Sequence, residues 1–186
     1  MQLLSEIKEK DASGKTLLLY NDIKYITGFP LVNLIYRSMA TVDGCLEWSW
    51  FTLRPLYLDN TFNNSINNFF DNNKTNMNYF LDFSSLSPDE QKLLSNTLDV
   101  YHNLNPINLI ALYSLKILLE KKATNKSFLP NIRLNNISSY KKILPIVDLD
   151  NTNKSSLESL ISLSKILNNE EPLVIPSLFR HISPWP

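Results

Sequence analysis

The sequence predicts an all-α protein, built from one helical unit and an incomplete second copy of it. Along most of the chain apolar residues recur every three or four positions, the period of one face of an α-helix. The 186 residues include only 3 glycines, which argues against a turn-rich β architecture. The segment FPLVNLIYRSM at 29–39 recurs, degraded, as PLVIPSLFRHI at 172–182, so that Tyr36 aligns with Phe179, 143 positions later. Such long-period self-similarity is typical of duplicated units that pack on each other.

The repeat divides the chain into three parts. We expect residues 1–122 to form the first helical repeat, complete, and residues 153–186 to begin a second repeat that is truncated. Residues 123–152 show little periodicity and many Asn and Ser, so we expect a linker there. A last helix is expected at about 153–168, and it matches the first helix of the chain in order.

The first two helices are predicted from their ends. Asp11 is a candidate N-cap, and Gly28 stands where a C-terminal cap belongs. The next helix has Pro30 in its first turn, where the missing N–H does no harm, and runs to about Met39.

Two further helices follow in the first repeat. Asp43 is the N-cap candidate of a helix that ends near Pro55, with Trp48 and Trp50 as expected core aromatics. Residues 60–80 are rich in Asn but keep a rough helical period, which predicts a helix with a loop near its middle.

The strongest start signal lies at Ser87, where a capping box with Glu90 is followed by proline at the first helical position. The pair Asn105-Pro106 repeats this pattern of cap and proline and predicts another helix start. Residues 107–119 are apolar on nearly every face, so we expect this helix to be buried centrally.

Composition excludes several classes of function. A formal net charge of zero leaves no electrostatic footprint for nucleic acid or an anionic membrane. No apolar run approaches the roughly 20 residues that span a bilayer, and the first ten residues lack a signal-peptide pattern. We therefore expect a cytoplasmic protein. Cys45 is the only cysteine, which excludes a disulfide framework and a cysteine-rich metal site.

A series of short motifs resembles the group I 2-haloacid dehalogenases, which act on D and L substrates. The motifs of the first repeat are DASGK at 11–15, YNDI at 20–23, PLVNLIYR at 30–37, AT at 40–41 and LEWSW at 46–50. The segment YHNLNPINL at 101–109 resembles the middle of that family's chain. The segments PSLFRH at 176–181 and WP at 185–186 resemble the opening of its second repeat.

The resemblance implies a two-repeat helical fold, distantly related to the alkylhydroperoxidase-like fold, and a hydrolase without a cofactor. In that family an aspartate of the second repeat activates water, which displaces halide from the carbon next to a carboxylate, with inversion. Because halide is a good leaving group, a positioned base and a site that seats the carboxylate suffice. The implied partner is thus a small carboxylic acid.

The resemblance also assigns residues. Tyr36 stands where many relatives have a Trp that walls the substrate pocket, and Asn105 and Asn108 match the stretch that supplies a polar contact. The expected position of the catalytic base is Leu178, with Ser177 before it. Because leucine cannot take a proton, we expect family membership without dehalogenase activity, and the catalytic residue stays unassigned.

Other readings of these residues stay open. Arg37 and Arg180 occupy matching positions, and they either recognise a carboxylate or form structural ion pairs. Asn105 before a proline also fits a helix cap. Asn108 lies inside an apolar helix, where a buried amide needs partners.

Titratable groups offer few alternatives. His102 and His181 lack the spacing of metal ligands, so no metal site is expected. Asp148 and Asp150, in the expected linker, are conceivable replacement bases, although exposed loop carboxylates are far commoner than catalytic ones. Ser177 and His181 form an i, i+4 pair, but no orienting acid is identifiable, which argues against a hydrolase dyad.

A different class of function competes with the enzyme. A half-built second unit exposes apolar surface, and this favours a non-catalytic helical protein that self-associates as a homodimer. The residues concerned are Leu173, Val174, Ile175, Leu178 and Phe179. A fragment of a longer dehalogenase-like protein would carry the same pattern.

Overall fold

The computed structural model describes residues 2–72, 85–120 and 142–184, and within them it confirms the all-α prediction. An isolated β-bridge joins Leu3 and Leu173. The helices are η1 (Glu9–Asp11), α1 (Gly14–Thr27), α2 (Leu34–Met39), α3 (Cys45–Leu58), α4 (Asn60–Asn72), α5 (Pro88–Leu119), η2 (Leu149–Asn151), α6 (Lys154–Leu167) and α7 (Ser177–Ile182). No helix among these residues is both long and apolar enough to cross a membrane.

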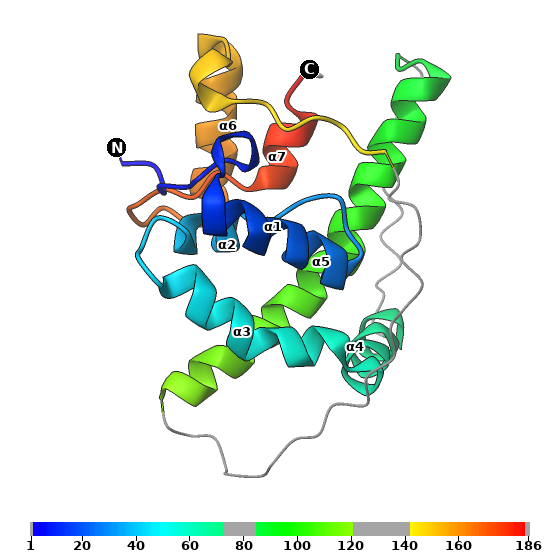
Figure 1. Cartoon of the computed structure of the whole chain (residues 1–186). Helices are drawn as coiled ribbons and strands as arrows, with labels where there is room; N and C mark the ends of the chain where they lie inside the picture. Colours follow the sequence, from blue (N-terminus) through cyan, green and yellow to red (C-terminus); the bar gives the residue numbers. More distant parts are fainter. Residues whose placement is uncertain (1, 73–84, 121–141, 185–186) are drawn as a thin grey trace.

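The long helix α5 is the central helix on which the others pack (Figure 1). Helix α3 packs on it and in turn carries α1 and α2, while α4 contacts both α3 and α5. The main core lies between these helices, and it centres on the fully buried Trp50. The other core residues are Leu19, Tyr20, Ile23, Val32, Tyr36, Leu46, Leu53, Tyr57, Ala111 and Leu115.

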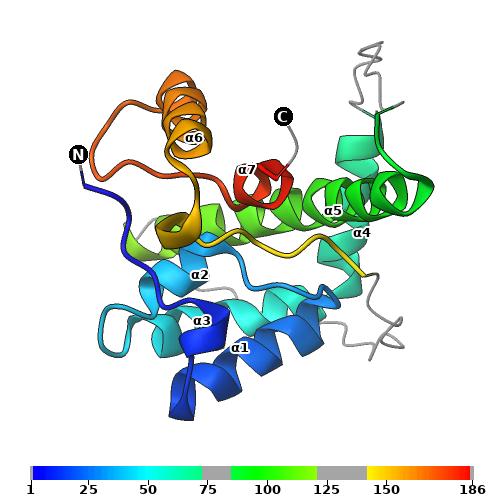
Figure 2. The same ribbon diagram turned by 90° about the horizontal axis from the view of Figure 1, so that it is seen from above.

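A second, smaller core joins α7 to the middle of α5. It consists of Leu31, Val100, Tyr101 and Leu104, with Leu178 among the half-buried residues packed on it. Two extended segments, residues 2–8 and 142–148, run past α7 and α2 (Figure 2).

The local signals at two helix ends are confirmed. Gly28 caps α1 in the left-handed conformation with φ of 71°, which glycine adopts without the steric cost of a Cβ. Ser87 accepts a hydrogen bond from the Glu90 backbone while the Glu90 side chain returns to the Ser87 backbone, which completes the capping box. The helix expected at 60–80 is seen at 60–72, and residues 73–80 lie outside the described part of the chain.

Two predicted helix starts in the N-terminal part of the chain are wrong. The N-cap of α1 is Ser13, since Asp11 ends the short turn η1. The helix expected at Pro30 begins only at Leu34, because the backbone at Asn33 is still extended, with ψ of 147°. The Val32 N–H donates to the carboxylate of Glu9 at 2.8 Å and so makes its hydrogen bond outside the helix.

Two proline signals also misled the prediction. Helix α3 continues through Pro55 to Leu58, and α5 runs unbroken through Pro106. In each case the residue four positions earlier, Phe51 or His102, is exposed, so the carbonyl that loses its bond lies on the solvent side. The N-cap of α3 is Gly44 rather than Asp43.

Burial differs from expectation at α5 and α3. The α5 segment at 107–119 has one buried face, because Leu109 and Tyr113 are exposed on the other. Trp48 is likewise exposed, whereas Trp50 and Tyr36 are core aromatics as predicted. Of the expected linker, residues 123–141 lie outside the described chain, as do Trp185 and Pro186.

Two groups of elements share one order and one set of lengths. The group η1, α1 and α2 has 3, 14 and 6 residues, and the group η2, α6 and α7 has 3, 14 and 6 residues as well. The same backbone bond recurs in both, since Ile7 N donates to Arg37 O at 3.0 Å and Val147 N donates to Arg180 O at 3.2 Å.

Candidate functional site

Two of the predicted substrate-binding residues, Tyr36 and Asn108, belong to one buried hydrogen-bond chain. The Tyr57 hydroxyl donates to Asn108 Oδ1 at 2.5 Å and lies 2.7 Å from the Tyr36 hydroxyl. Because each phenol has one proton, Tyr36 donates to Tyr57, and the chain runs in one direction toward the amide. Burial raises the pKa of Tyr36 to about 12 and that of Tyr57 well above its usual range, so both phenols stay neutral.

The amide of Asn108 retains a donor. Its Nδ2 is buried and makes no hydrogen bond within the described part of the chain. The hydroxyl of Tyr101, seven residues earlier on the same face of α5, is also buried, but the Ser177 side chain lies near enough to lower its pKa against the effect of burial. Buried polar groups without partners cost about 1–3 kcal/mol each, and they mark places where a water molecule or ligand fits.

Asn105 and Ser177 lie in different surroundings. The Asn105 side chain is exposed, and its Oδ1 accepts a hydrogen bond from Asn33 Nδ2 at 3.3 Å. The Ser177 hydroxyl is buried, accepts from Arg37 Nη2 at 2.9 Å and also faces the hydroxyl of Tyr101. The structure therefore brings Tyr36 and Asn108 together, and places Ser177 beside Arg37.

Leu178, at the expected position of the base, packs on the small core of Leu31, Val100, Tyr101 and Leu104. Its side chain is held by apolar contacts and offers no atom that accepts a proton.

Arg37 and Arg180 converge on one carboxylate. Glu6 Oε2 accepts from Arg37 Nε at 2.6 Å, and Glu6 Oε1 accepts from Arg180 Nη1 at 2.5 Å. The arginine side chains are 4% and 3% exposed, and that of Glu6 is 11% exposed. Burial alone would raise the pKa of Glu6, but the two guanidinium groups outweigh it and lower the pKa. The ion-pair reading of these arginines is thus correct.

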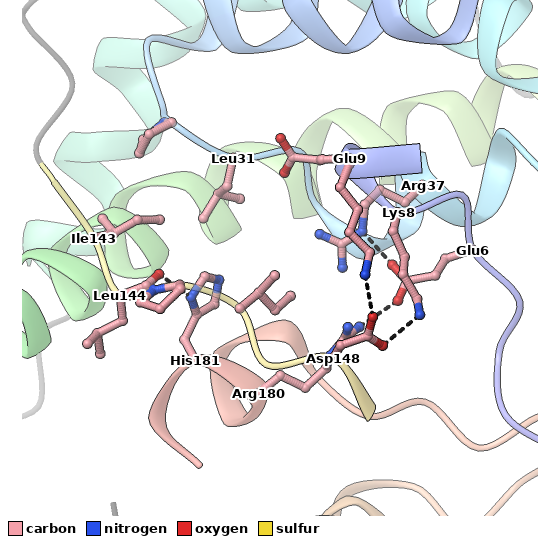
Figure 3. Close-up of a pocket in the computed structure, with 14 residues that line it drawn as sticks. Glu6, Lys8, Glu9, Leu31, Arg37, Ile143, Leu144, Asp148, Arg180 and His181 are labelled. Carbon is pink, nitrogen blue, oxygen red and sulfur yellow. Dashed lines mark hydrogen bonds and ion pairs between the residues drawn. The ribbon is translucent and has the colours of Figure 1, made fainter. Parts of the chain in front are cut away.

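A cavity of about 390 Å³ opens beside this triad. The charged triad and Lys8, Lys10 and Asp148 line one side of it, and Leu31 and Ile143 lie across from them (Figure 3). Asp148 accepts from Lys8 at 2.6 Å and from Lys10 at 2.7 Å, and the bonds from Lys10 and Lys8 lower the pKa of its carboxyl far below its usual range. A carboxylate so stabilised is a poor proton acceptor, which weighs against Asp148 as a replacement base.

His181 also lines this cavity. Its Nδ1 lies 2.7 Å from the carbonyl of Leu144, which only a donor can satisfy, so Nε2 is the acceptor of the neutral ring. Burial lowers the pKa of His181, and the charges of Arg37 and Arg180 lower it further although the bond to Leu144 opposes them. The ring stacks edge-on to Tyr101 at 5.6 Å between centroids.

Metal-ligand geometry is not found among the described residues, where no three His, Cys, Asp or Glu side chains gather as a metal site requires. Sequence reasoning missed Glu6 and Tyr57. Neither belongs to a motif, and their partners are 21 to 174 residues away along the chain, so no local signal could have identified them.

Comparison with known proteins shows the fold. Neither a protein-family model nor the sequence of a curated protein matches this chain. Among solved structures, a D-2-haloacid dehalogenase mutant in complex with D-2-CPA matches with a TM-score of 0.78 at 16% identity, over all of this chain and 67% of that one. A D-2-haloacid dehalogenase with L-LA matches at 0.77 and 16%, and a further mutant at 0.76 and 17%, with the same coverage. The chain has the helical fold of these dehalogenases and spans about two thirds of their length.

Proposed function

We propose that this chain is a dehalogenase-like protein that binds a small carboxylic acid at Asn108 and does not hydrolyse its carbon–halogen bond. The observation that carries the proposal is Leu178, an apolar side chain packed on an apolar core where the resemblance expects the base. Hydrolysis of a haloacid requires a group that takes the proton of the attacking water. The similar dehalogenase structures, one of them in complex with D-2-CPA, support the class of ligand.

The polar chain behind Asn108 suits this role. Tyr36 and Tyr57 fix the amide with its oxygen toward Tyr57 and its Nδ2 unpaired. An N–H in a buried site is a good donor to a carboxylate, because a bond to a charged acceptor contributes about 1.5–3 kcal/mol.

We further infer that the chain contains two copies of one unit. The shared lengths and order of η1-α1-α2 and η2-α6-α7 support it, and so does the start of α2 and α7 at residues 34 and 177, the offset of the sequence repeat. On this inference the second unit reaches upstream to include residues 142–152, which lie at the end of the expected linker.

The test measures binding and turnover separately. Purified protein is titrated with each enantiomer of 2-chloropropionate by calorimetry, and halide release is followed in parallel. We expect binding without release, and binding about tenfold weaker in Asn108→Ala. Asn103→Ala on the exposed face of α5 is the matched control and should bind like the wild type. Halide release by the wild type, or binding indifferent to Asn108, would contradict the proposal.

Self-association is a second candidate, favoured by the outer face of α6. Leu163, Ile166 and Leu167 are exposed there, Ile166 to 80%. A groove of about 650 Å³ between α6 and α7 adjoins them, with Leu160 and Phe179 among its walls. Light scattering after gel filtration tests it: a dimer that Ile166→Lys converts to a monomer would support this function, and a monomeric wild type at 100 μM would exclude it.

A further inference from the structure

The triad of Glu6, Arg37 and Arg180 at the end of the cavity carries a positive charge that no other charged group among the described residues neutralises. Two buried guanidinium groups, Arg37 and Arg180, share the single, partly buried carboxylate of Glu6. A buried charge without a counterion is costly because the low-dielectric interior cannot solvate it. An anion in the adjoining cavity would remove that cost.

The neighbouring charges do not cancel this excess. Lys8 and Lys10 are balanced by Asp148 and Asp150, with Lys8 bonded to both carboxylates. Glu9, at another edge of the cavity, pairs with Lys24. Because these pairs are balanced, the triad keeps one excess positive charge.

The Nη2 group of Arg180 can donate a hydrogen bond to a ligand. Arg37 uses its three nitrogens on Glu6, Val32 O and Ser177. Arg180 Nε donates to Val147 O and Nη1 to Glu6, whereas Nη2 makes no hydrogen bond to the residues that the structure describes. A carboxylate at this end of the cavity could accept from that nitrogen.

The rest of the cavity is apolar. Leu31, Ile143, Leu144 and Ile146 contribute to its wall, opposite or beside the charged end (Figure 3). Its volume of about 390 Å³ falls within the 300–1,000 Å³ of ordinary ligand pockets, which is more than a two- or three-carbon acid fills.

We propose that this cavity is a second ligand site, which binds an amphipathic monocarboxylate with its acid group at Arg180 and an apolar tail of several carbons along Leu31, Ile143 and Leu144. The site is distinct from the one proposed above, since neither Tyr36 nor Asn108 lines the cavity. The ligand class is a medium-chain acid rather than a short 2-haloacid.

The variants for the test avoid the buried triad. Ile146 lies on the cavity wall and is partly exposed, so a polar residue is tolerated there. Ile146→Glu places a negative charge where the tail meets the acid end, and Ile146→Gln has the same shape without the charge. The probe is octanoate, with 1-octanol as its uncharged analogue.

Calorimetry on the full chain should show octanoate binding and much weaker octanol binding. We expect Ile146→Glu to weaken octanoate at least tenfold relative to Ile146→Gln, because it neutralises the excess charge and repels the anion. Equal affinity for octanol and octanoate, equal affinity of the two variants, or no octanoate binding at millimolar concentration would overturn the proposal.

Two readouts locate the ligand. The chain has 2 histidines, so NMR resolves the cavity residue His181 from the exposed His102. Octanoate should move the His181 ring signals and leave those of His102 in place; the reverse would overturn the proposal. Asn108→Ala should bind octanoate normally even where it loses 2-chloropropionate, so that each site can fail on its own. Loss of both ligands in Asn108→Ala would contradict a separate site.

Discussion

The buried triad makes the most exacting prediction of this structure. Replacing Glu6 with Gln removes the one carboxylate that Arg37 and Arg180 share, at 2.6 Å and 2.5 Å. Both guanidinium groups stay in place, since they are also tied to Val32 O and Val147 O. Breaking a buried ion pair by removing one partner typically costs 3–5 kcal/mol. Because the Gln amide oxygen still accepts one of the two bonds, we expect a loss of about 3 kcal/mol.

Urea unfolding followed by circular dichroism measures this loss as a lower midpoint at unchanged slope. The matched control is Glu47→Gln, which removes a surface pair between Lys15 and Glu47 with side chains 83% and 37% exposed. Exposed pairs contribute about 0–1 kcal/mol, so this variant should unfold like the wild type. A Glu6→Gln protein within about 1 kcal/mol of wild type would refute the reasoning that the carboxylate shared by the two arginines stabilises the fold.

The same triad predicts a dependence on pH. The pKa of Glu6 is lower in the folded protein than in the unfolded chain, where it is about 4.3. The contribution of Glu6 to the free energy of unfolding is therefore fully present above the unfolded pKa. It is lost as the pH falls through the lower pKa of the folded protein. The difference in stability between wild type and Glu6→Gln should be constant above pH 6 and should shrink below pH 4.

Three further changes probe other parts of the chain. Leu178→Asp should release halide from 2-chloropropionate, and this release should require Asn108. Leu178→Asn, which has the same shape but cannot take the proton, should release none. A folded Leu178→Asp protein without release would show that the missing base is not the only obstacle. Tyr57→Phe should lower the free energy of unfolding by about 1–3 kcal/mol, because it leaves Asn108 Oδ1 buried without its donor, and urea titration tests this. Gly28→Ala should cost about 1 kcal/mol in the same assay, since alanine is strained at φ of 71° although no atom lies within 4 Å of the new methyl group; an unchanged midpoint in either variant would contradict its premise.

The sequence allowed prediction of those features that depend on neighbours along the chain. The all-α class, the cap at Gly28 and the box at Ser87 are local, and the structure confirms them. The helix ends predicted at Pro55 and Pro106 are wrong because they too rest on a local signal. A proline disfavours the helix by only a few kcal/mol, and the packing of α3 on α5 overrides that preference.

The candidate site was predictable only in part. Resemblance pointed to Asn108 and Tyr36, and they share a buried chain, but Tyr57 between them carries no sequence signal. Glu6 carries no sequence signal either, because its two partners come from helices at opposite ends of the chain. Long-range pairing of charges follows from the topology, and a periodicity argument cannot supply it.

The inferred duplication explains why the triad has too few carboxylates. Glu6 precedes Ile7, whose N–H donates to Arg37 O, and Ile146 precedes Val147, whose N–H donates to Arg180 O. On the inferred duplication, Ile146 occupies in the second unit the place that Glu6 occupies in the first. Two equivalent arginines face one acid and one apolar residue, and the excess charge lies beside the cavity that both residues line.

This equivalence predicts a rescue. In the double variant Glu6→Gln/Ile146→Glu the acid moves from one unit to the other, and the carboxylate again faces the arginine pair. We expect it to recover at least half of the stability that Glu6→Gln loses, with a coupling energy of 0.5–3 kcal/mol as found for residues in one network. The double variant Glu6→Gln/Ile146→Gln should recover none of the lost stability. Strictly additive losses in the double-mutant cycle would mean that residue 146 does not share the environment of Glu6, and the excess charge would then need another explanation.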